Sequence, residues 1–412
     1  MSELYTSRWL EWPAHVLPGD EKLPQGFRAG GIAAGLKASG RSDLAVLVCD
    51  EGSSTSAIRQ TRSSAAAAPV LVNRELVNPG QIRAIVANSG NANAATGEEG
   101  FENAVQMRDH TAAALGIARD STAVCSTGVI GKQLNLDAVC AGIESVVPLL
   151  SIDGGASLSE AILTTDKGEK VVSVDIELPG GTVKMTAQAK GAGMIQPAFA
   201  TMFCFVQTDA VVSEETCDLL LGTVVKRSFE RISVDGQLST NDVVILMASG
   251  ASGVAVEPQT EAEALFGQAL DTVLRSLALM IVADGEGSAR VGRLVVEGGE
   301  DQTVEHVART VAGSPLVKSA LHGGDPNWGR IIQAVGMALP DSSRIPVDIE
   351  IEGTLVCSAG TAVPYDEGAL AKAVAGDEVE YLVRIPGTGS VSEVFFSDLS
   401  HEYVTINSEY TT

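Results

Sequence analysis

The stretch that most constrains the fold runs from Lys190 to Phe205, in the middle of the chain. Two glycines and a proline break its first part, and an apolar, β-rich run follows from Thr201. Glycine and proline mark loops, whereas short apolar runs bounded by such residues are typical of strands. We therefore predict a loop that enters a buried strand at the junction of Ala200 and Thr201.

A threonine at the head of a buried strand can act on its own peptide bond. Its Oγ can attack the Ala200 carbonyl, shift the acyl group from nitrogen to oxygen, and let water release a chain that begins with Thr201. The new α-amine has an unperturbed pKa of about 7.7 to 8.0. It can therefore serve as the general base for the neighbouring hydroxyl, which the β-branch holds in few orientations. The junction predicts self-cleavage and a nucleophilic Thr201.

The composition predicts a dense α/β protein with two lobes or one large multilayer domain. The chain has 412 residues, 45% of them hydrophobic, and 43 glycines. A net charge of -24 argues against nucleic-acid or anionic-membrane partners, since phosphate binding needs clustered Lys and Arg. We find no long uncharged apolar run and no apolar signal core at the start. The expectation is a cytoplasmic protein without a membrane span.

The cysteines and histidines predict no metal site. The 6 cysteines are scattered without a C-x-x-C pair, and the 5 histidines show no H-E-x-x-H spacing. Cys125 and Cys204 lie in apolar runs, so we expect buried, packed thiols. Without a metal or a Ser/His/Asp motif, a Thr201 nucleophile needs another base, and its own amine would supply it. No cofactor is expected.

Two glycine-containing segments follow predicted strands. Gln81–Ala87 reads as a strand that enters a polar loop, Asn88–Gly97, and Ala123–Gly131 reads as a strand that enters a glycine turn. In the second segment, the Thr127 hydroxyl and the Gly128 N-H could stabilise an oxyanion, and the missing Cβ would permit close approach. Both segments are also compatible with ordinary turns.

Four further polar residues have a structural and a functional interpretation. Thr164 and Thr165 follow a predicted helix. Their hydroxyls could do no more than hydrogen-bond the free backbone groups at the helix end. Lys190 could be a solvated charge, or a fixed ammonium for a carboxylate. Glu286 follows a helix expected over residues 261–282, where a carboxylate is poorly placed for the helix dipole. It could instead pair with a substrate ammonium group.

The central stretch closely resembles the self-cleavage region of the ornithine acetyltransferase (glutamate N-acetyltransferase) family. The shared pattern is Lys-Gly-x-Gly-Met, then Pro, then Ala-Thr-Met, then Thr-Asp-Ala. Other matching segments are Asn91–Asn93, Thr164–Asp166, Asp235–Asp242 and Gly323–Arg330, in the family's order. The resemblance extends from Gly26 to Thr412. The family often has Asp-Thr or Ser-Thr where this chain has Gln-Leu after Gly236, which leaves local hydrogen bonding in doubt.

The resemblance implies a set of site residues. It places Thr127 and Gly128 in an oxyanion hole, makes Thr201 the nucleophile, and sets the cleavage between Ala200 and Thr201. Substrate contacts are implied, in chain order, at Thr164 (with Thr165 as its neighbouring alternative), Lys190, Thr201, Glu286, Asn407 and Thr412.

The resemblance also implies the architecture. The family fold is a layered α-β-β-α sandwich similar to that of N-terminal nucleophile hydrolases, with a smaller C-terminal α/β lobe. Applied to this chain, the resemblance implies an N-terminal extension over residues 1–25. After self-cleavage, the α chain would end at Ala200, with its globular part over 26–200. The β chain would cover 201–412, with the smaller lobe from about 290. The two chains are expected to stay together and to form a higher oligomer.

The implied reaction moves an acetyl group from N2-acetyl-L-ornithine to L-glutamate by a ping-pong mechanism through acetyl-Thr201, a step of arginine biosynthesis. Four alternatives stay open. They are a bifunctional enzyme that also uses acetyl-CoA, a specialised-metabolism paralogue acting on another acylated amino acid, a self-processing aminopeptidase in which water replaces glutamate, and a non-enzymatic binding protein. Self-processing would be hard to reconcile with the last.

Overall fold

The computed structural model describes residues 4–52, 54–196, 202–339, 345–387 and 389–409. Ala200, Thr201 and Thr412, which carry three of the predicted site positions, lie outside these residues.

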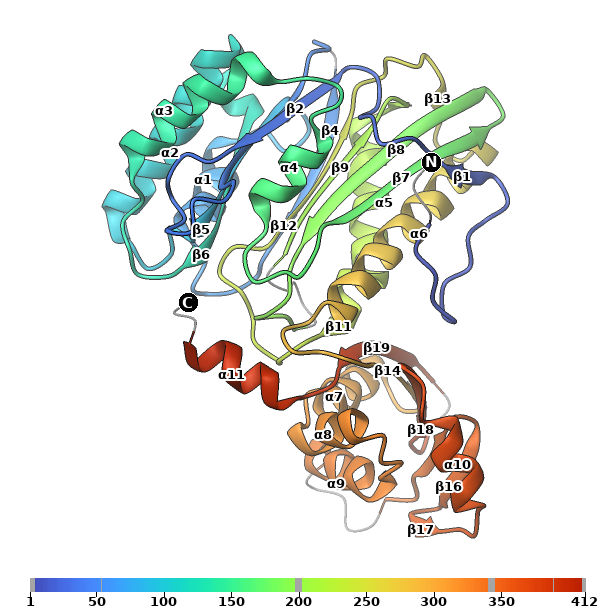
Figure 1. Cartoon of the computed structure of the whole chain (residues 1–412). Helices are drawn as coiled ribbons and strands as arrows, with labels where there is room; N and C mark the ends of the chain where they lie inside the picture. Colours follow the sequence, from blue (N-terminus) through green and yellow to red (C-terminus); the bar gives the residue numbers. More distant parts are fainter. Residues whose placement is uncertain (1–3, 53, 197–201, 340–344, 388, 410–412) are drawn as a thin grey trace.

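Two β-sheets face each other in the main body (Figure 1). The larger has the strand order β1-β7-β8-β9-β12-β4, and the smaller has the order β2-β3-β5-β6. The larger sheet contains β1 (Val16–Pro18), β7 (Lys170–Leu178), β8 (Gly181–Lys190), β9 (Phe203–Thr208), β12 (Val243–Ala248) and β4 (Thr55–Gln60). The smaller contains β2 (Phe27–Ile32), β3 (Leu44–Cys49), β5 (Ala84–Asn91) and β6 (Thr122–Val129).

Strand alternation divides the apolar side chains between two cores. Along β9, Phe203 and Phe205 point into the core between the sheets. Cys204 and Val206 point to the opposite face, toward the helices that cover the larger sheet. Successive side chains of a strand point to opposite faces, so a continuous apolar run is what a strand buried on both sides requires.

Helices cover the outer face of each sheet. The helices α5 (Glu214–Arg227) and α6 (Glu261–Ala283) pack on the larger sheet. The smaller sheet is covered by α1 (Ala68–Leu76), α2 (Gly97–Leu115) and α3 (Leu136–Val146), and α4 (Gly155–Ile162) contributes to the core between the sheets. This arrangement confirms the predicted layered α-β-β-α sandwich.

The helix α6 packs on the outer face of the larger sheet, beside α5. By length and composition alone it could cross a membrane, but 67% of its most apolar window is buried inside the protein. Phe266, Leu270 and Leu274 on this helix are fully buried in the core that it shares with α5 and the larger sheet. Its apolar character is therefore explained by internal packing.

A second lobe is built on a seven-stranded sheet with its own core. Its strand order is β11-β19-β14-β18-β15-β16-β17, and the first of these strands comes from the main body. The strands are β11 (Ile232–Ser233), β14 (Val291–Glu297), β15 (Asp348–Ile351), β16 (Thr354–Ser358), β17 (Thr361–Ala362), β18 (Glu378–Arg384) and β19 (Val391–Ser397). The helices are α7 (Asp301–Ala312), α8 (Pro315–Gly323), α9 (Trp328–Ala338) and α10 (Glu367–Ala373).

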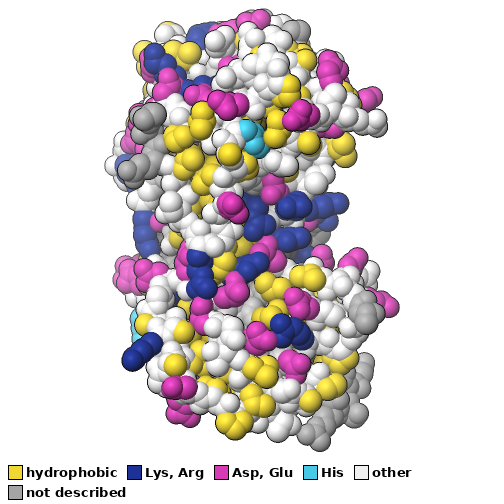
Figure 2. Space-filling model, turned by 90° about the vertical axis from the view of Figure 1, so that its right-hand side faces the viewer, with side chains coloured by type: hydrophobic (Ala, Val, Ile, Leu, Met, Phe, Trp, Pro, Cys, Tyr) yellow, Lys and Arg dark blue, Asp and Glu magenta, His cyan; other side chains and the backbone are white. Residues whose placement is uncertain are grey.

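An ion-pair cluster helps to join the two parts. Glu393 on β19 is nearly buried and pairs with Arg231 and Arg275 of the main body and with Arg293 of the lobe. Figure 2 shows basic side chains gathered at the waist between the two parts. The last helix, α11 (His401–Glu409), then runs from the lobe back under the main body (Figure 1).

The N-terminal segment is more ordered than the sequence suggests. We expected a loosely structured extension, but β1 pairs with β7 in the larger sheet. The Trp9 ring lies 5.5 Å from that of Phe395, and its indole N-H donates to Glu380 of the lobe. This segment therefore packs against both parts of the molecule.

Strand β5 continues past its predicted end, whereas β6 lies within the segment predicted for it apart from its first residue. β5 continues to Asn91, through residues that we assigned to the following loop, and β6 continues to Val129. Their parallel pairing persists to Gly90 and Gly128, which are register partners. Inter-strand hydrogen bonds thus hold polar and glycine residues that, taken alone, favour turns.

Asn73 on α1 offers a test of this packing. Its buried amide mimics a neighbouring strand at the edge of the smaller sheet, donating to the Val124 carbonyl at 2.7 Å and accepting from the Val124 N-H at 2.9 Å. We expect Asn73→Ala to lower the free energy of unfolding by roughly 1–3 kcal/mol, because both buried backbone groups lose their partner. Urea titration measures the loss, and Glu75→Ala on the exposed side of the same helix is the control. A variant as stable as the wild type would contradict the account.

Candidate active site

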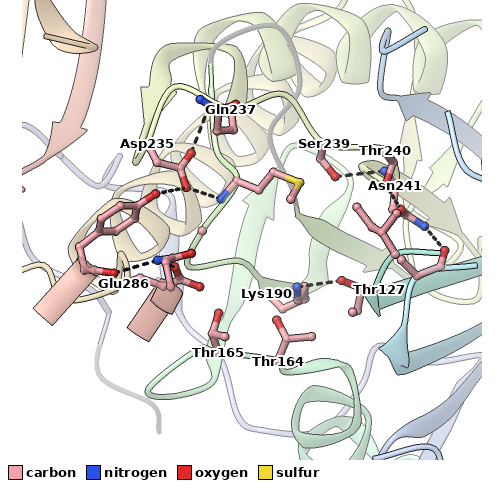
Figure 3. A pocket seen from close by; sticks show the side chains of 17 residues that line it. Thr127, Thr164, Thr165, Lys190, Asp235, Gln237, Ser239, Thr240, Asn241 and Glu286 are labelled. Atoms are coloured by element: carbon pink, nitrogen blue, oxygen red, sulfur yellow. Dashed lines mark hydrogen bonds between the residues drawn. The ribbon is translucent and has the colours of Figure 1, made fainter. Parts of the chain in front are cut away.

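A cavity of about 130 Å³ opens where β6, β8, the loop after α4, the segment after β11 and α11 meet (Figure 3). Six of the residues singled out from the sequence line it, although they are spread over most of the chain. They are Thr127, Gly128, Thr164, Lys190, Glu286 and Asn407. Thr165, the neighbouring alternative, also lines it.

The candidate oxyanion pair lies at the end of β6. Thr127 is nearly buried, and Gly128 has a φ of +129°. A Cβ at Gly128 would lie only 2.4 Å from the carbonyl carbon of Gly90 on the adjacent strand. Glycine is therefore required here for two reasons, namely the backbone angle and the close approach of β5.

Lys190 orients the Thr127 hydroxyl. The lysine ends β8, is 1% exposed, and donates from Nζ to Thr127 Oγ1 at 3.1 Å (Figure 3). Because an ammonium group only donates, the hydroxyl oxygen is the acceptor in this pair. The hydroxyl hydrogen is then left to point elsewhere, and it can be donated to a negatively charged oxygen in the cavity. The interpretation of Lys190 as a solvated surface charge is wrong.

A buried charge network surrounds Lys190. Burial lowers the pKa of Lys190, while the carboxylate of Asp166 opposes that shift. Burial raises the pKa of Asp166, but Lys190 and Lys170 outweigh it and hold that pKa well below its usual range. Lys170 in turn donates to Asp166 at 2.8 Å and to Asp284 at 2.5 Å. The network keeps opposite charges together away from water, as buried ions require.

Asp166 is also the point that fixes two walls of the cavity. Its carboxylate accepts from the N-H of Thr164 at 3.0 Å and from the N-H of Gly191 at 2.6 Å. One bond sets the Thr164 loop, and the other sets the residue after Lys190. The sequence analysis quoted Asp166 only as part of a motif and missed this positioning role.

Glu286 meets the C-terminal helix across the cavity. Its backbone N-H donates to the Ala192 carbonyl at 2.8 Å, and its side chain accepts from Asn407 Nδ2 at 2.7 Å. The same Asn407 amide donates to the Tyr403 carbonyl one turn earlier in α11. The end of the chain thus reaches the cavity, although from physics alone chain ends are expected to fray.

Asp235 holds the segment that leads to the predicted cleavage site. Its two carboxylate oxygens accept from the N-H groups of Met194 at 2.6 Å and Ile195 at 2.9 Å. In return, the Ile195 carbonyl accepts from the Val234 N-H at 2.9 Å. Met194 has a φ of +58°, a backbone angle that residues other than glycine rarely adopt. The two hydrogen bonds from Asp235 therefore stabilise a strained turn. Asp235 was not predicted as a site residue.

The polar segment before β12 ties the two sheets together beside the cavity. Asn241 donates from Nδ2 to the carbonyls of Ala92 and Ser126, each at 2.7 Å. The fully buried Asp242 accepts from the N-H of Met202 at 3.0 Å, and burial raises its pKa well above the usual value. This carboxylate is therefore next to the first described residue after the predicted cleavage site.

The cysteines fit the predicted packing role. Cys125 and Cys204 are buried, and burial raises the pKa of both thiols, which disfavours the nucleophilic thiolate. Among the residues that the structure describes, no three His, Cys, Asp or Glu side chains are grouped so that they could hold a metal ion.

The sequence as a whole matches one protein family. The model of the ArgJ family matches residues 28–412. The chain belongs to the ArgJ family. It is 39% identical to the arginine biosynthesis bifunctional protein ArgJ of Caldanaerobacter subterraneus subsp. tengcongensis, over 96% of this chain and 100% of that protein. It is 41% identical to the protein of the same name from Deinococcus radiodurans, over 95% of this chain and 98% of that protein.

Solved structures are also similar. One of them is a chain of the ornithine acetyltransferase of Mycobacterium tuberculosis, complexed with ornithine, which is 35% identical to this protein. The match includes 98% of that chain and 45% of this one, with a TM-score of 0.41. The suspected family is confirmed by the family model and the whole-length relatives, which carry the assignment.

Within this ArgJ-family chain, the roles of the site residues stay predictions. The structure brings six of them to one cavity, and the remaining positions lie outside the described residues. The residues that were missed are Asp166, Asp235, Asp242 and Tyr403. Each acts through contacts with segments far away in sequence, so a single-sequence pattern carries little signal for them. For Asp166, Asp235 and Asp242, presence in the quoted motifs was the available hint.

We expect Asp166→Asn to destabilise the protein by roughly 3–5 kcal/mol at pH 7, because it leaves buried ammonium groups without their counter-charge. The pKa of Asp166 is lower in the folded than in the unfolded protein, where it is about 3.9. The ionised carboxylate therefore contributes its full share to the free energy of unfolding above that pH, and the contribution is lost as the pH falls toward the folded pKa. The difference between wild type and variant should therefore shrink below about pH 4.

Urea unfolding at pH 7 and pH 3.5 measures this difference. The control is Asp153→Asn, at an exposed position. An Asp166→Asn protein that matches the wild type at pH 7, or a difference that does not change with pH, would show that the Asp166 charge does not support this cavity.

Proposed function

We propose that this protein transfers the acetyl group of N2-acetyl-L-ornithine to L-glutamate, through an acetyl ester on Thr201, after self-cleavage between Ala200 and Thr201. Its place would be in arginine biosynthesis, which the names of its full-length relatives support. The observation that carries the proposal is the Lys190–Thr127 hydrogen bond, since it turns a buried hydroxyl into an oxyanion donor at the end of β6.

The first half of the reaction acylates the enzyme. Thr201 Oγ attacks the acetyl carbonyl, and its hydroxyl proton passes to the Thr201 α-amine. Negative charge develops on the carbonyl oxygen, where the Thr127 hydroxyl and the Gly128 N-H would donate to it. Collapse of this intermediate breaks the amide bond, and the departing ornithine amine takes the proton from the Thr201 ammonium.

The second half reverses these steps with another amine. The α-amine of glutamate attacks acetyl-Thr201, the same donors stabilise the oxyanion, and N-acetylglutamate leaves. Other cavity residues would bind the substrates. Glu286 suits the side-chain ammonium of ornithine, whereas Thr164, Lys190, Asn407 and Thr412 are the remaining proposed contacts.

The sheet pairing supports a processed but undivided protein. β8 would be the last described strand of the α chain, and β9 would be the first described strand of the β chain. They are antiparallel neighbours, with Lys190 opposite Phe203. β4 and β12 pair across the same division. Separating the chains would break these ladders and expose both cores, so we propose that the two chains remain associated, in an oligomer, in the cytoplasm.

Thr201→Ala tests the nucleophile. We expect a chain that stays uncleaved and has lost transfer, because both the hydroxyl and the new α-amine are missing. Gel electrophoresis shows the cleavage, and transfer of labelled acetyl from N-acetylornithine to glutamate measures the activity. Thr201→Ser, which keeps the hydroxyl, is the matched variant and should retain both to a reduced degree. A cleaved or active Thr201→Ala protein would refute the assignment.

Two other functions have distinct outcomes. The relatives are named bifunctional, which favours a second acetyl donor. Replacing N-acetylornithine with acetyl-CoA in the transfer assay tests for that donor. An aminopeptidase would release acetate or amino acids without glutamate. Initial rates that give parallel double-reciprocal lines in N-acetylornithine and glutamate support the ping-pong transferase, whereas hydrolysis independent of glutamate supports the aminopeptidase.

A further inference from the structure

A ping-pong site of this kind has an electrostatic problem. The donor side chain of N-acetylornithine ends in an ammonium group, whereas the side chain of glutamate ends in a carboxylate. Two carboxylates, Asp235 and Glu286, line the described part of the cavity, and they would attract the first side chain and repel the second. Lys190 is the only cation among the described lining residues, and the carboxylate of Asp166 beside it already offsets its charge. Glutamate carries a side-chain carboxylate in addition to the α-carboxylate that both substrates share, so one cation does not serve both groups. The acceptor therefore needs a cation elsewhere.

A second hollow of about 490 Å³ adjoins the first, and Thr164 lines both. Lys37, Arg41 and Lys132 line this hollow, and no Asp or Glu is among its described lining residues. In a chain with a net charge of -24, a cavity lined only by basic charges is unusual. Its field favours an anion.

Lys37 is held in place by its own loop. The buried carboxylate of Asp43 accepts from the N-H groups of Ala34, Leu36 and Lys37 at 2.6 to 2.8 Å. The ammonium of Lys37 donates to the Ser42 carbonyl at 2.7 Å, and an ammonium has three hydrogens to donate. The side chain is thus fixed and retains donors for a ligand.

Lys37 also lies beside β5, the strand that neighbours the oxyanion pair of β6. A Cβ at Gly90 would lie 3.0 Å from Lys37 Cγ, so the lysine packs over this glycine. Gly90 in turn contacts Gly128 of the oxyanion pair. Burial and Arg41 lower the pKa of Lys37 to about 8, Lys190 adds to the lowering, and Asp43 and Asp166 oppose it. The Lys37 charge therefore acts within range of the buried network under the cavity.

We propose that Lys37, with Arg41 and Lys132 beside it, binds the side-chain carboxylate of the acyl acceptor. The cavity and the hollow then form two arms that meet at Thr164. Glu286 in one arm receives the cationic side chain of the donor, and Lys37 in the other receives the anionic side chain of the acceptor. The inference rests on the proposed function, because it assumes an acidic amino acid as acceptor.

The test compares two reactions that share the nucleophile, the oxyanion donors and an attacking amine. One is acetyl transfer from N-acetylornithine to glutamate. The other is acetyl exchange between N-acetylornithine and isotopically labelled ornithine, whose side chain is cationic. We expect Lys37→Met to lower kcat/KM for glutamate about 10- to 100-fold, since it removes a charge-assisted hydrogen bond. The exchange reaction should stay within about twofold of the wild-type rate.

Two further variants complete the design. Lys37→Arg keeps the charge and should retain most of the glutamate reaction. Lys372→Met removes one positive charge from α10 in the distant lobe and should change neither reaction (Figure 1). The ornithine exchange also reports whether each variant is folded, so that a loss confined to glutamate is specific.

The outcomes separate the possible failures. An equal fall in both reactions, or no fall in either, would overturn the role of Lys37. A phosphate of acetyl-CoA could occupy a basic hollow by the same chemistry, so acetylation by acetyl-CoA is measured in the same variants. A fall confined to acetyl-CoA would assign the hollow to a donor and overturn the proposal. A wild-type protein that performs neither transfer nor exchange would refute the proposed function itself.

Discussion

The hydrogen bond from the buried ammonium of Lys190 to the Thr127 hydroxyl is the contact on which the rest of the cavity depends. An ammonium group taken out of water is stable only beside compensating charge, and Asp166 supplies it. Asp166 also holds the backbone next to Lys190 and Thr164. One interior carboxylate therefore sets the charge, the hydroxyl orientation and two walls of the site.

The fold places the predicted cleavage between two adjacent strands of the larger sheet. The hydrogen bonds of β8 and β9 do not depend on the loop that joins them, so cutting that loop leaves the sheet intact. The approach to the loop is fixed by Asp235, and the first described residue after it is fixed by Asp242. The described residues on both sides of the predicted cleavage site are thus anchored by carboxylates, the partly buried Asp235 and the fully buried Asp242.

The family resemblance implied the layers, whereas strong periodic signals in the sequence predicted individual elements. The predicted helix over Glu261–Val282 agrees with α6 to within a residue. The end of β5 was misplaced because pairing between distant segments overrides the turn preference of Asn and Gly. The same long-range effect hid the roles of Asp166, Asp235 and Lys37, whose partners are apparent only once the chain is folded.

The most direct test is the intact mass of the purified protein after incubation with N-acetylornithine, without glutamate. The account predicts two fragments divided before Thr201, with one acetyl group, about 42 Da from its chemical formula, added to the fragment that begins there. Addition of glutamate should remove that mass. A single uncleaved chain, or an acetyl group on another residue, would contradict the assignment of Thr201 as the nucleophile.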